Sequence, residues 1–244
     1  MRVRVRFSKV GKVRFVGHRD VARMWERALR KASVAVAYSE GFSPRPRLSF
    51  GLALPTGAES LAEYLDIEMV GDRDPAELLA TFAAAVPPGF GVLAVSAVER
   101  SDPSLQEDVV ASSWEILLRG INVDAATAAV DRALAAPELL LERERKGEKR
   151  IDDVRPAIEQ LAIRVDTTDG GEEGEPVLLA DLATRPRGLR PSELLEVTFP
   201  DVEDLIELSG RVLRRHQWIE RDGARRELLP LDAAAAPHTE PVCA

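Results

Sequence analysis

The chain has 244 residues, of which 45% are hydrophobic and 30% charged, and its formal net charge is −8. This composition is typical of a globular protein of one or two domains, and no apolar run reaches the roughly 20 residues of a transmembrane helix. Its single cysteine, Cys243, excludes an intrachain disulfide, a four-cysteine zinc site and an iron–sulfur cluster held by this chain alone. We therefore expect a cytoplasmic protein with no metal or other cofactor of its own and no membrane partner.

The charge is unevenly distributed along the chain. Residues 1–50 contain 13 Lys and Arg but only three acidic residues, which gives this part a net charge of +10 and leaves −18 for the remainder. Such an asymmetry indicates that the N-terminal part binds an anionic partner, or that it docks on the acidic part of the same molecule.

The N-terminal elements are predicted from their periodicity. Residues 1–7 alternate between apolar and basic side chains, which predicts a half-buried strand with a basic outer face, and residues 12–16 alternate again, so the two are expected to form a hairpin. A helix is predicted over residues 19–32, with apolar side chains on one face. The opposite face carries a stripe of four arginines, Arg19, Arg23, Arg27 and Arg30.

A segment rich in proline and glycine follows at residues 34–50. It contains Tyr38 and Phe42, and Pro44 and Pro46 make its backbone stiff. The segment can be a structural connection between helix and sheet in which Phe42 fills the core. Its arginines, Arg45 and Arg47, can at the same time face a ligand, so we expect both roles together. The later elements are predicted strands at 48–54, 63–70 and 91–98 and a helix at 74–86 that begins at an Asp-Pro cap.

These elements predict an α+β fold of two ferredoxin-like-type α/β sandwich units, each with a mixed or antiparallel sheet and helices on one face. In the second unit, strands are predicted at 113–119, 139–145, 149–154, 160–166 and 177–182, and helices at 124–135 and from a Ser192 cap to 197. The expected domains are residues 1–100, residues 111–200, a C-terminal helical segment at 201–230 with its helix over 201–215, and a disordered tail at 231–244. The similar element order of the two units suggests a weak structural repeat.

The start of the first predicted helix carries the candidate catalytic residues. Gly17 and Asp20 have the spacing of a helix cap, in which the Asp20 carboxylate reaches back to the cap N–H. His18 then occupies the first helical position, where an imidazole can contact a ligand and nearby backbone N–H groups face an anion. A role for His18 and Asp20 in acid–base chemistry and a purely structural role both remain open at this point.

Two motifs resemble those of the radical-SAM-linked protein family known as DUF2344. They are Phe15-Val16-Gly17-His18-Arg19-Asp20 and Tyr38-Ser39-Glu40-Gly41-Phe42-Ser43-Pro44-Arg45-Pro46. Members of this family occur as separate chains or as the C-terminal region of radical SAM proteins, so the resemblance implies association with such an enzyme. The family usually has histidine where this chain has Arg45, which argues against an essential general base at that position.

Three hypotheses about function follow. In the first, the chain is an accessory protein of a radical SAM enzyme and binds RNA through a basic surface made by Arg19, Arg23, Arg27, Arg30, Tyr38, Phe42, Arg45 and Arg47. In the second, it is an enzyme that acts on a phosphate-containing substrate with His18 and Asp20. In the third, it is an adaptor whose basic face docks on an acidic protein.

Overall fold

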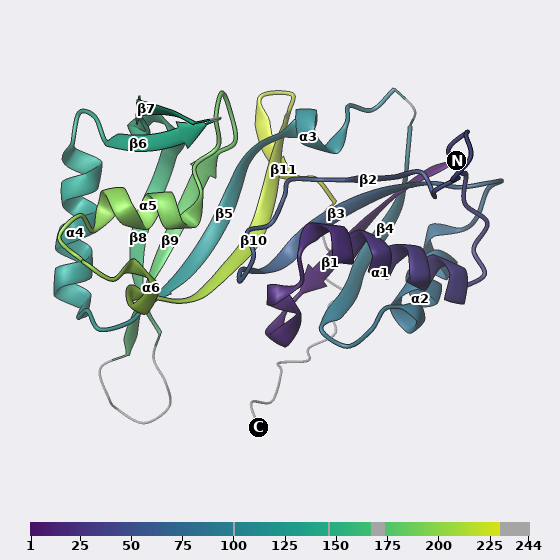
Figure 1. Ribbon diagram of the computed structural model, residues 1–244, viewed down its shortest axis with the longest axis horizontal. Helices are drawn as coiled ribbons and strands as arrows, with labels where there is room; N and C mark the ends of the chain where they lie inside the picture. Colours follow the sequence, from purple (N-terminus) through teal and green to yellow (C-terminus); the bar gives the residue numbers. More distant parts are fainter. Residues whose placement is uncertain (100, 146, 167–173, 230–244) are drawn as a thin grey trace. The chain divides into compact units, whose positions relative to one another are not determined.

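The computed structural model describes residues 1–99, 101–145, 147–166 and 174–229 (Figure 1). Two compact units divide the chain: unit 1 comprises residues 1–56, 61–108 and those from 226 onward, and unit 2 comprises residues 57–60 and 109–225. Both units contain helices and strands, so the fold is α+β. The tail predicted at 231–244 lies outside the described residues.

Unit 1 is built on the order strand, helix, strand, strand, helix, strand. Its elements are β1 (Arg2–Lys9), the 3₁₀-helix η1 (Gly11–Phe15), α1 (His18–Lys31), β2 (Leu48–Phe50), β3 (Glu59–Glu68), α2 (Pro75–Ala85), β4 (Phe90–Val98) and the short α3 (Leu105–Asp108). The strands lie in the order β4-β1-β3-β2, and β1 with β4 and β2 with β3 are antiparallel. This is the arrangement of a ferredoxin-like sandwich.

One face of this sheet packs against both helices. Val3, Val5 and Phe7 of β1 are buried in one apolar cluster with residues of α1 and α2. The Trp25 ring on α1 lies edge-on to Phe7, with ring centroids 5.3 Å apart, and 6.1 Å from Phe82 of α2. The two helices also contact each other (Figure 1), so the apolar side of α1 is fully used by the core.

Two predictions about β1 and the residues that follow it are wrong. Arg4 and Arg6 are buried rather than outward-facing, because Arg4 pairs with Asp66 and Arg6 donates to Glu227. The hairpin predicted over residues 1–16 is also wrong: residues 11–15 form η1. The physical reason is that β1 already has β4 on one side and β3 on the other, which leaves no free edge for a hairpin partner.

Unit 2 repeats the strand, helix, strand, strand, helix, strand order and has an additional hairpin after its first helix. Its elements are β5 (Val109–Leu118), α4 (Val123–Ala135), β6 (Leu140–Arg145), β7 (Glu148–Asp153), η2 (Arg155–Ala157), β8 (Ile158–Asp166), β9 (Glu175–Ala183), α5 (Pro191–Thr198), α6 (Leu205–Leu208), β10 (Ser209–Arg221) and β11 (Ala224–Glu227). The repeated order is formed by β5, α4, β8, β9, α5 and β10. The four main strands lie in the antiparallel order β10-β5-β9-β8, which again is the ferredoxin-like order. The hairpin of β6 and β7 forms a separate two-stranded sheet.

The C-terminal helical segment predicted at 201–230 is wrong. Only α6, residues 205–208, is helical there, and the chain then runs as β10 from Ser209 to Arg221. Apolar residues in this stretch also fit a helical spacing, but pairing with β5 along most of its length decides the conformation. The preceding helix, α5, begins at Pro191 with Arg190 as its N-cap rather than at a Ser192 cap, and the Glu193 carboxylate accepts a hydrogen bond from the Arg190 N–H at 2.8 Å.

Among the described residues, no helix has the length and apolar character needed to cross a membrane.

Candidate nucleic-acid interface

The solvent-facing side of α1 carries an arginine stripe formed by Arg19, Arg23, Arg27 and Arg30, all of which are exposed. The opposite side of the helix is buried, through Val21, Met24, Trp25, Ala28 and Leu29. Because the apolar spacing of the sequence fixes which side faces the core, the arginines are left pointing outward.

Few carboxylates neutralise this stripe. Arg23 pairs with Asp20, with 3.1 Å between Nη1 and Oδ1, and Arg30 Nε donates to the Glu26 backbone carbonyl at 3.2 Å. Within the described part of the chain, the guanidinium groups of Arg19 and Arg27 have neither an ion pair nor a hydrogen bond. Two guanidinium groups are therefore available to an external anion without breaking an internal contact.

The segment between α1 and β2 forms an exposed hairpin at residues 37–47, which we call the aromatic hairpin. Its backbone is held by hydrogen bonds from Ser39 N–H to the Arg45 carbonyl and from Arg47 N–H to the Ala37 carbonyl, both 2.8 Å. Phe42 at the tip is completely exposed, at 109% of its reference area, and Tyr38 is 47% exposed. Phe42 therefore does not fill the core, and the hairpin presents an aromatic ring to solvent.

The two predicted arginines of this hairpin differ in their surroundings. Arg45 is exposed and, among the described residues, makes no ion pair through its side chain. Arg47 pairs with Glu68 on β3 at 3.2 Å, and both side chains are about half exposed. Arg45 is thus the better candidate for an anion contact.

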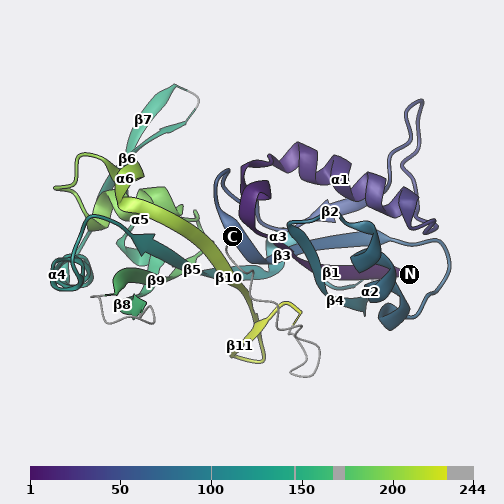
Figure 2. The same ribbon diagram turned by 90° about the horizontal axis from the view of Figure 1, so that it is seen from below.

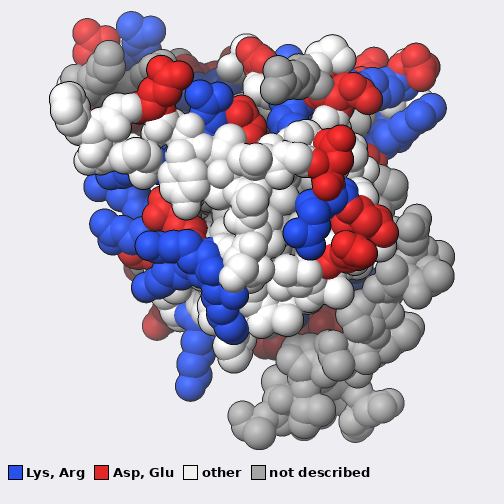
Figure 3. All heavy atoms as spheres, turned by 90° about the vertical axis from the view of Figure 1, so that its right-hand side faces the viewer, with Lys and Arg blue, Asp and Glu red and all other residues white. Residues whose placement is uncertain are grey.

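The figures relate the hairpin to the helix within unit 1. Figure 2 shows the segment that follows α1 extending to the same side of the sheet as α1. Figure 3 shows Lys and Arg side chains gathered at the lower left of the face that it presents, with few acidic side chains among them. The structure therefore gives unit 1 a basic, aromatic-bearing side.

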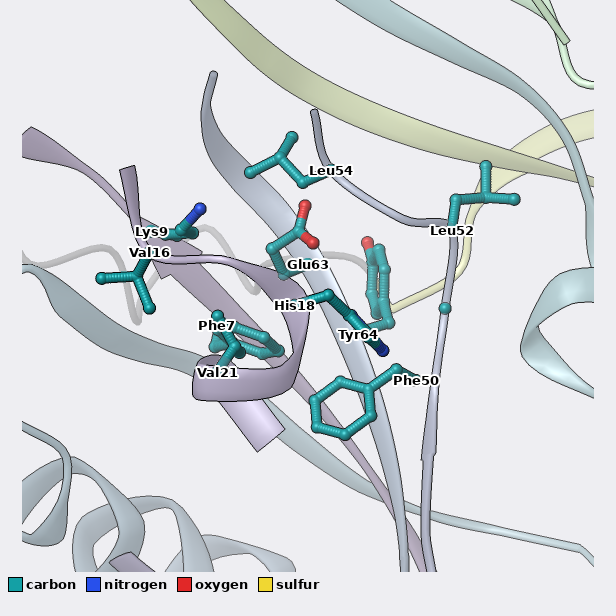
Figure 4. A pocket seen from close by; sticks show the side chains of 11 residues that line it. Phe7, Lys9, Val16, His18, Val21, Phe50, Leu52, Leu54, Glu63 and Tyr64 are labelled. Atoms are coloured by element: carbon teal, nitrogen blue, oxygen red, sulfur yellow. The ribbon is translucent and has the colours of Figure 1, made fainter. Parts of the chain in front are cut away.

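His18 lies at the rim of a small hollow at the start of α1 (Figure 4). Its ring is edge-on to Phe50, with ring centroids 5.1 Å apart. The hollow has a volume of about 20 Å³, space for roughly one water molecule. Its other lining side chains include Lys9, Glu63, Tyr64, Leu52 and Leu54.

Asp20 does not share this hollow with His18. Its carboxylate pairs with Arg23, and the predicted cap at Gly17 has no side-chain hydrogen bond. Two charged residues that we did not predict as site residues line the hollow: Lys9 stands at the end of β1, and Glu63 comes from β3, far away in the chain. The Lys9 ammonium donates to the Arg14 backbone carbonyl at 3.0 Å. His18 therefore shares the hollow with Lys9 and Glu63 and not with Asp20.

Tyr64, in the wall of this hollow, has a buried hydroxyl that makes no hydrogen bond within the described part of the chain. Burial raises the pKa of the Tyr64 phenol far above its ordinary value, although the nearby positive charge of Arg6 opposes this shift. The phenol is therefore neutral at physiological pH and belongs to the interior of unit 1.

Fold and surface together define an α+β protein of two ferredoxin-like units with a basic helix and an aromatic hairpin on the first. The comparisons then identify the family. The family described as "Uncharacterized protein conserved in bacteria (DUF2344)" matches residues 2–189, so the chain belongs to the DUF2344 family.

A search of the curated proteins gives no match. Among solved structures, the chain is similar to one chain in the "Crystal Structure of a Cbf5-Nop10-Gar1 Complex", with 9% sequence identity and a TM-score of 0.48. The similarity covers 88% of this chain and 48% of that chain, so this chain spans about half the length of that protein.

Proposed function

We propose that this chain is an accessory protein that binds RNA through unit 1 and presents it to a radical SAM enzyme carried on a separate chain. The observation that carries the proposal is the arginine stripe of α1, on which Arg19 and Arg27 make no hydrogen bond or ion pair with the described residues, together with an aromatic hairpin with a fully exposed Phe42. Guanidinium groups bind phosphate through two parallel hydrogen bonds, and exposed aromatic rings stack on unpaired bases.

RNA explains both features better than an acidic protein does. An acidic protein surface would match the arginine stripe, but it gives no reason for a solvent-exposed ring at the tip of a hairpin. A single-stranded nucleic acid offers phosphates to the arginines and bases to Phe42 at the same time. We name RNA rather than DNA because the first hypothesis from the sequence is RNA binding, and the experiment below compares the two.

The enzyme partner is supported by the sequence motifs. The resemblance of residues 15–20 and 38–46 to radical-SAM-linked proteins suggests the association, and a chain with one cysteine does not by itself supply the thiolates of an iron–sulfur cluster. The chemistry would then be carried out by the partner, and this chain would position the substrate.

The experiment is a titration of fluorescently labelled single-stranded RNA, and of DNA of the same sequence, with the protein. We expect Arg23→Glu/Arg27→Glu to abolish RNA binding and leave the melting temperature unchanged, because both side chains are exposed and two attractive phosphate contacts become repulsive. The matched control is Arg150→Glu. Arg150 is an exposed arginine on β7 of unit 2, and the variant protein should bind RNA like the parent. Parental affinity in the double variant would overturn the RNA proposal and favour the adaptor hypothesis.

A further inference from the structure

A row of polar side chains crosses the sheet of unit 2. Residues directly opposite each other in antiparallel strands project from the same face. Gln160 of β8 is opposite Asp181 of β9, Asp181 is opposite Ser113 of β5, and Ser113 is opposite His216 of β10. Along β9, the residues that alternate with Asp181 project from the opposite face and are buried: Leu178, Ala180 and Leu182. The polar row therefore lies on the side of the sheet away from its apolar core.

Hydrogen bonds and ring stacking fix the orientation of this row. The Ser113 hydroxyl donates to the Asp181 carboxylate and accepts from Nε1 of Trp218 at 2.7 Å. The His216 ring stacks on Trp218, with centroids 5.0 Å apart and an interplanar angle of 27°. Because the indole is held by its hydrogen bond, the imidazole lies on a fixed platform.

The row lines a hollow of about 250 Å³ on this face. His216 lines the hollow whereas Trp218 does not, so the imidazole is the ring of this stack that borders the hollow. The volume is below the roughly 300–1,000 Å³ of pockets that hold drug-sized ligands, which favours a ligand of one ring system. At the edge, Arg215 lies 3.8 Å from Glu115.

We propose that this hollow binds one unstacked nucleobase, which extends the stack on His216 and forms hydrogen bonds through its edge with Gln160 and Asp181. The identity of the ligand as RNA rests on the function proposed above, but the site lies in unit 2 and uses none of the same residues. Single-stranded RNA is commonly read in this way, by splayed bases that stack on side-chain rings and bond through their edges.

The chemistry of the row predicts which bases bind. An ionised carboxylate only accepts hydrogen bonds, whereas a glutamine amide both donates and accepts. The Asp181 carboxylate accepts from Ser113 through Oδ1, and its Oδ2 lies 3.8 Å from Nη1 of Arg225, so each oxygen keeps a further lone pair. The Gln160 amide makes no hydrogen bond among the described residues. The site therefore prefers a base with an exocyclic amino group, adenine, cytosine or guanine, over uracil.

The test uses uncharged nucleosides, so that the arginine stripe of unit 1 has no phosphate to bind. The chain has three tryptophans, and their indole N–H signals can be followed by ¹H–¹⁵N NMR, with Trp218→Phe assigning the Trp218 signal. We expect adenosine and cytidine to shift the Trp218 signal saturably and more tightly than uridine. His216→Ala should weaken this binding about tenfold or more, and Asp181→Asn, which adds a donor where the carboxylate only accepts, should remove the preference over uridine. Glu220→Ala, an exposed position on β10 that does not line the hollow, is the matched control and should behave like the parent.

The same samples are then titrated with single-stranded RNA, which separates the two proposals. No saturable shift with any nucleoside, in a protein that binds RNA, would overturn the base site and leave the proposed function standing. Equal shifts with all three nucleosides, or an unchanged affinity in His216→Ala, would also overturn the base site. Nucleoside binding in a protein that fails to bind RNA would support the site and contradict the function proposed for unit 1.

Discussion

Arg4 on β1 and Asp66 on β3 form a buried ion pair with two parallel hydrogen bonds. Nε lies 2.8 Å from Oδ1 and Nη2 lies 2.9 Å from Oδ2, and both side chains are only 5% exposed. To bind an external phosphate, Arg4 would have to give up both hydrogen bonds to the buried Asp66, which would keep only Arg2, 3.9 Å away. This pair therefore removes Arg4 from the anion-binding surface of unit 1.

The first prediction concerns the stability contributed by this pair. Arg4→Met should lower the free energy of unfolding by about 3–5 kcal/mol, since the buried Asp66 carboxylate loses both of its hydrogen bonds from Arg4 and keeps only Arg2, 3.9 Å away. Arg4→Met/Asp66→Leu should recover much of that loss because it removes both charges. The comparison is Arg47→Met, whose partner Glu68 is half exposed, and which should cost no more than about 1 kcal/mol. Urea unfolding measures all three variants, and equal losses for Arg4→Met and Arg47→Met would contradict the assignment.

The alternation of β1 was predictable from the sequence, but its environment was not. The pattern indicates a strand with one apolar and one basic face, and β1 is such a strand. What covers the basic face depends on Asp66 and Glu227, which are distant along the chain, and no local pattern connects them to β1. The same reason explains the error at 201–215, where β10 is decided by its pairing with β5 and not by its own spacing.

The candidate site was also only partly predictable from the sequence. Helical periodicity placed the arginine stripe on the outer face of α1, because that prediction depends only on residues within the helix. The exposure of Phe42 depends on how a hairpin folds back on itself, which the local sequence pattern does not show. The stack of His216 and Trp218 was not predicted because both residues fall in the helical segment expected at 201–230. They instead lie on a strand, where residues two apart share a face.

A second prediction concerns the aromatic hairpin. Phe42→Ala should leave the melting temperature unchanged, because the ring touches solvent on all sides, and should lower the affinity for single-stranded RNA about tenfold through lost stacking. Phe82→Ala is the opposite case: its ring is fully buried, so we expect a loss of about 3–5 kcal/mol in unfolding free energy. Thermal melts and RNA titrations on both variants check this contrast. Unchanged RNA affinity in Phe42→Ala would remove the hairpin from the interface.

A third prediction follows from the raised pKa of Tyr64. The folded protein holds the phenol neutral, whereas the unfolded chain releases its proton near pH 10. The stabilising effect of this shift is therefore fully present below about pH 10 and is lost as the pH rises from there toward the higher folded pKa. In urea unfolding across this alkaline range, Tyr64→Phe should show a weaker decline in stability than the parent.

Tyr38→Phe is the natural control for that series, because Tyr38 is the other tyrosine of the chain and is about half exposed. Its alkaline stability profile should follow that of the parent. An identical decline in the parent and in Tyr64→Phe would show that the Tyr64 phenol does not cause it.

The central claim, that phosphates of RNA contact the arginine stripe of α1, is tested most directly by the salt dependence of binding. For single strands, the logarithm of the affinity falls with the logarithm of the salt concentration by about 0.7 for each phosphate contact. Replacing Arg19 and Arg27, the two arginines of the stripe whose guanidinium groups make no hydrogen bond or ion pair among the described residues, by glutamine should therefore reduce this slope by about 1.4, with Arg150→Gln leaving it unchanged. A slope that is the same in the parent and in Arg19→Gln/Arg27→Gln would contradict the claim.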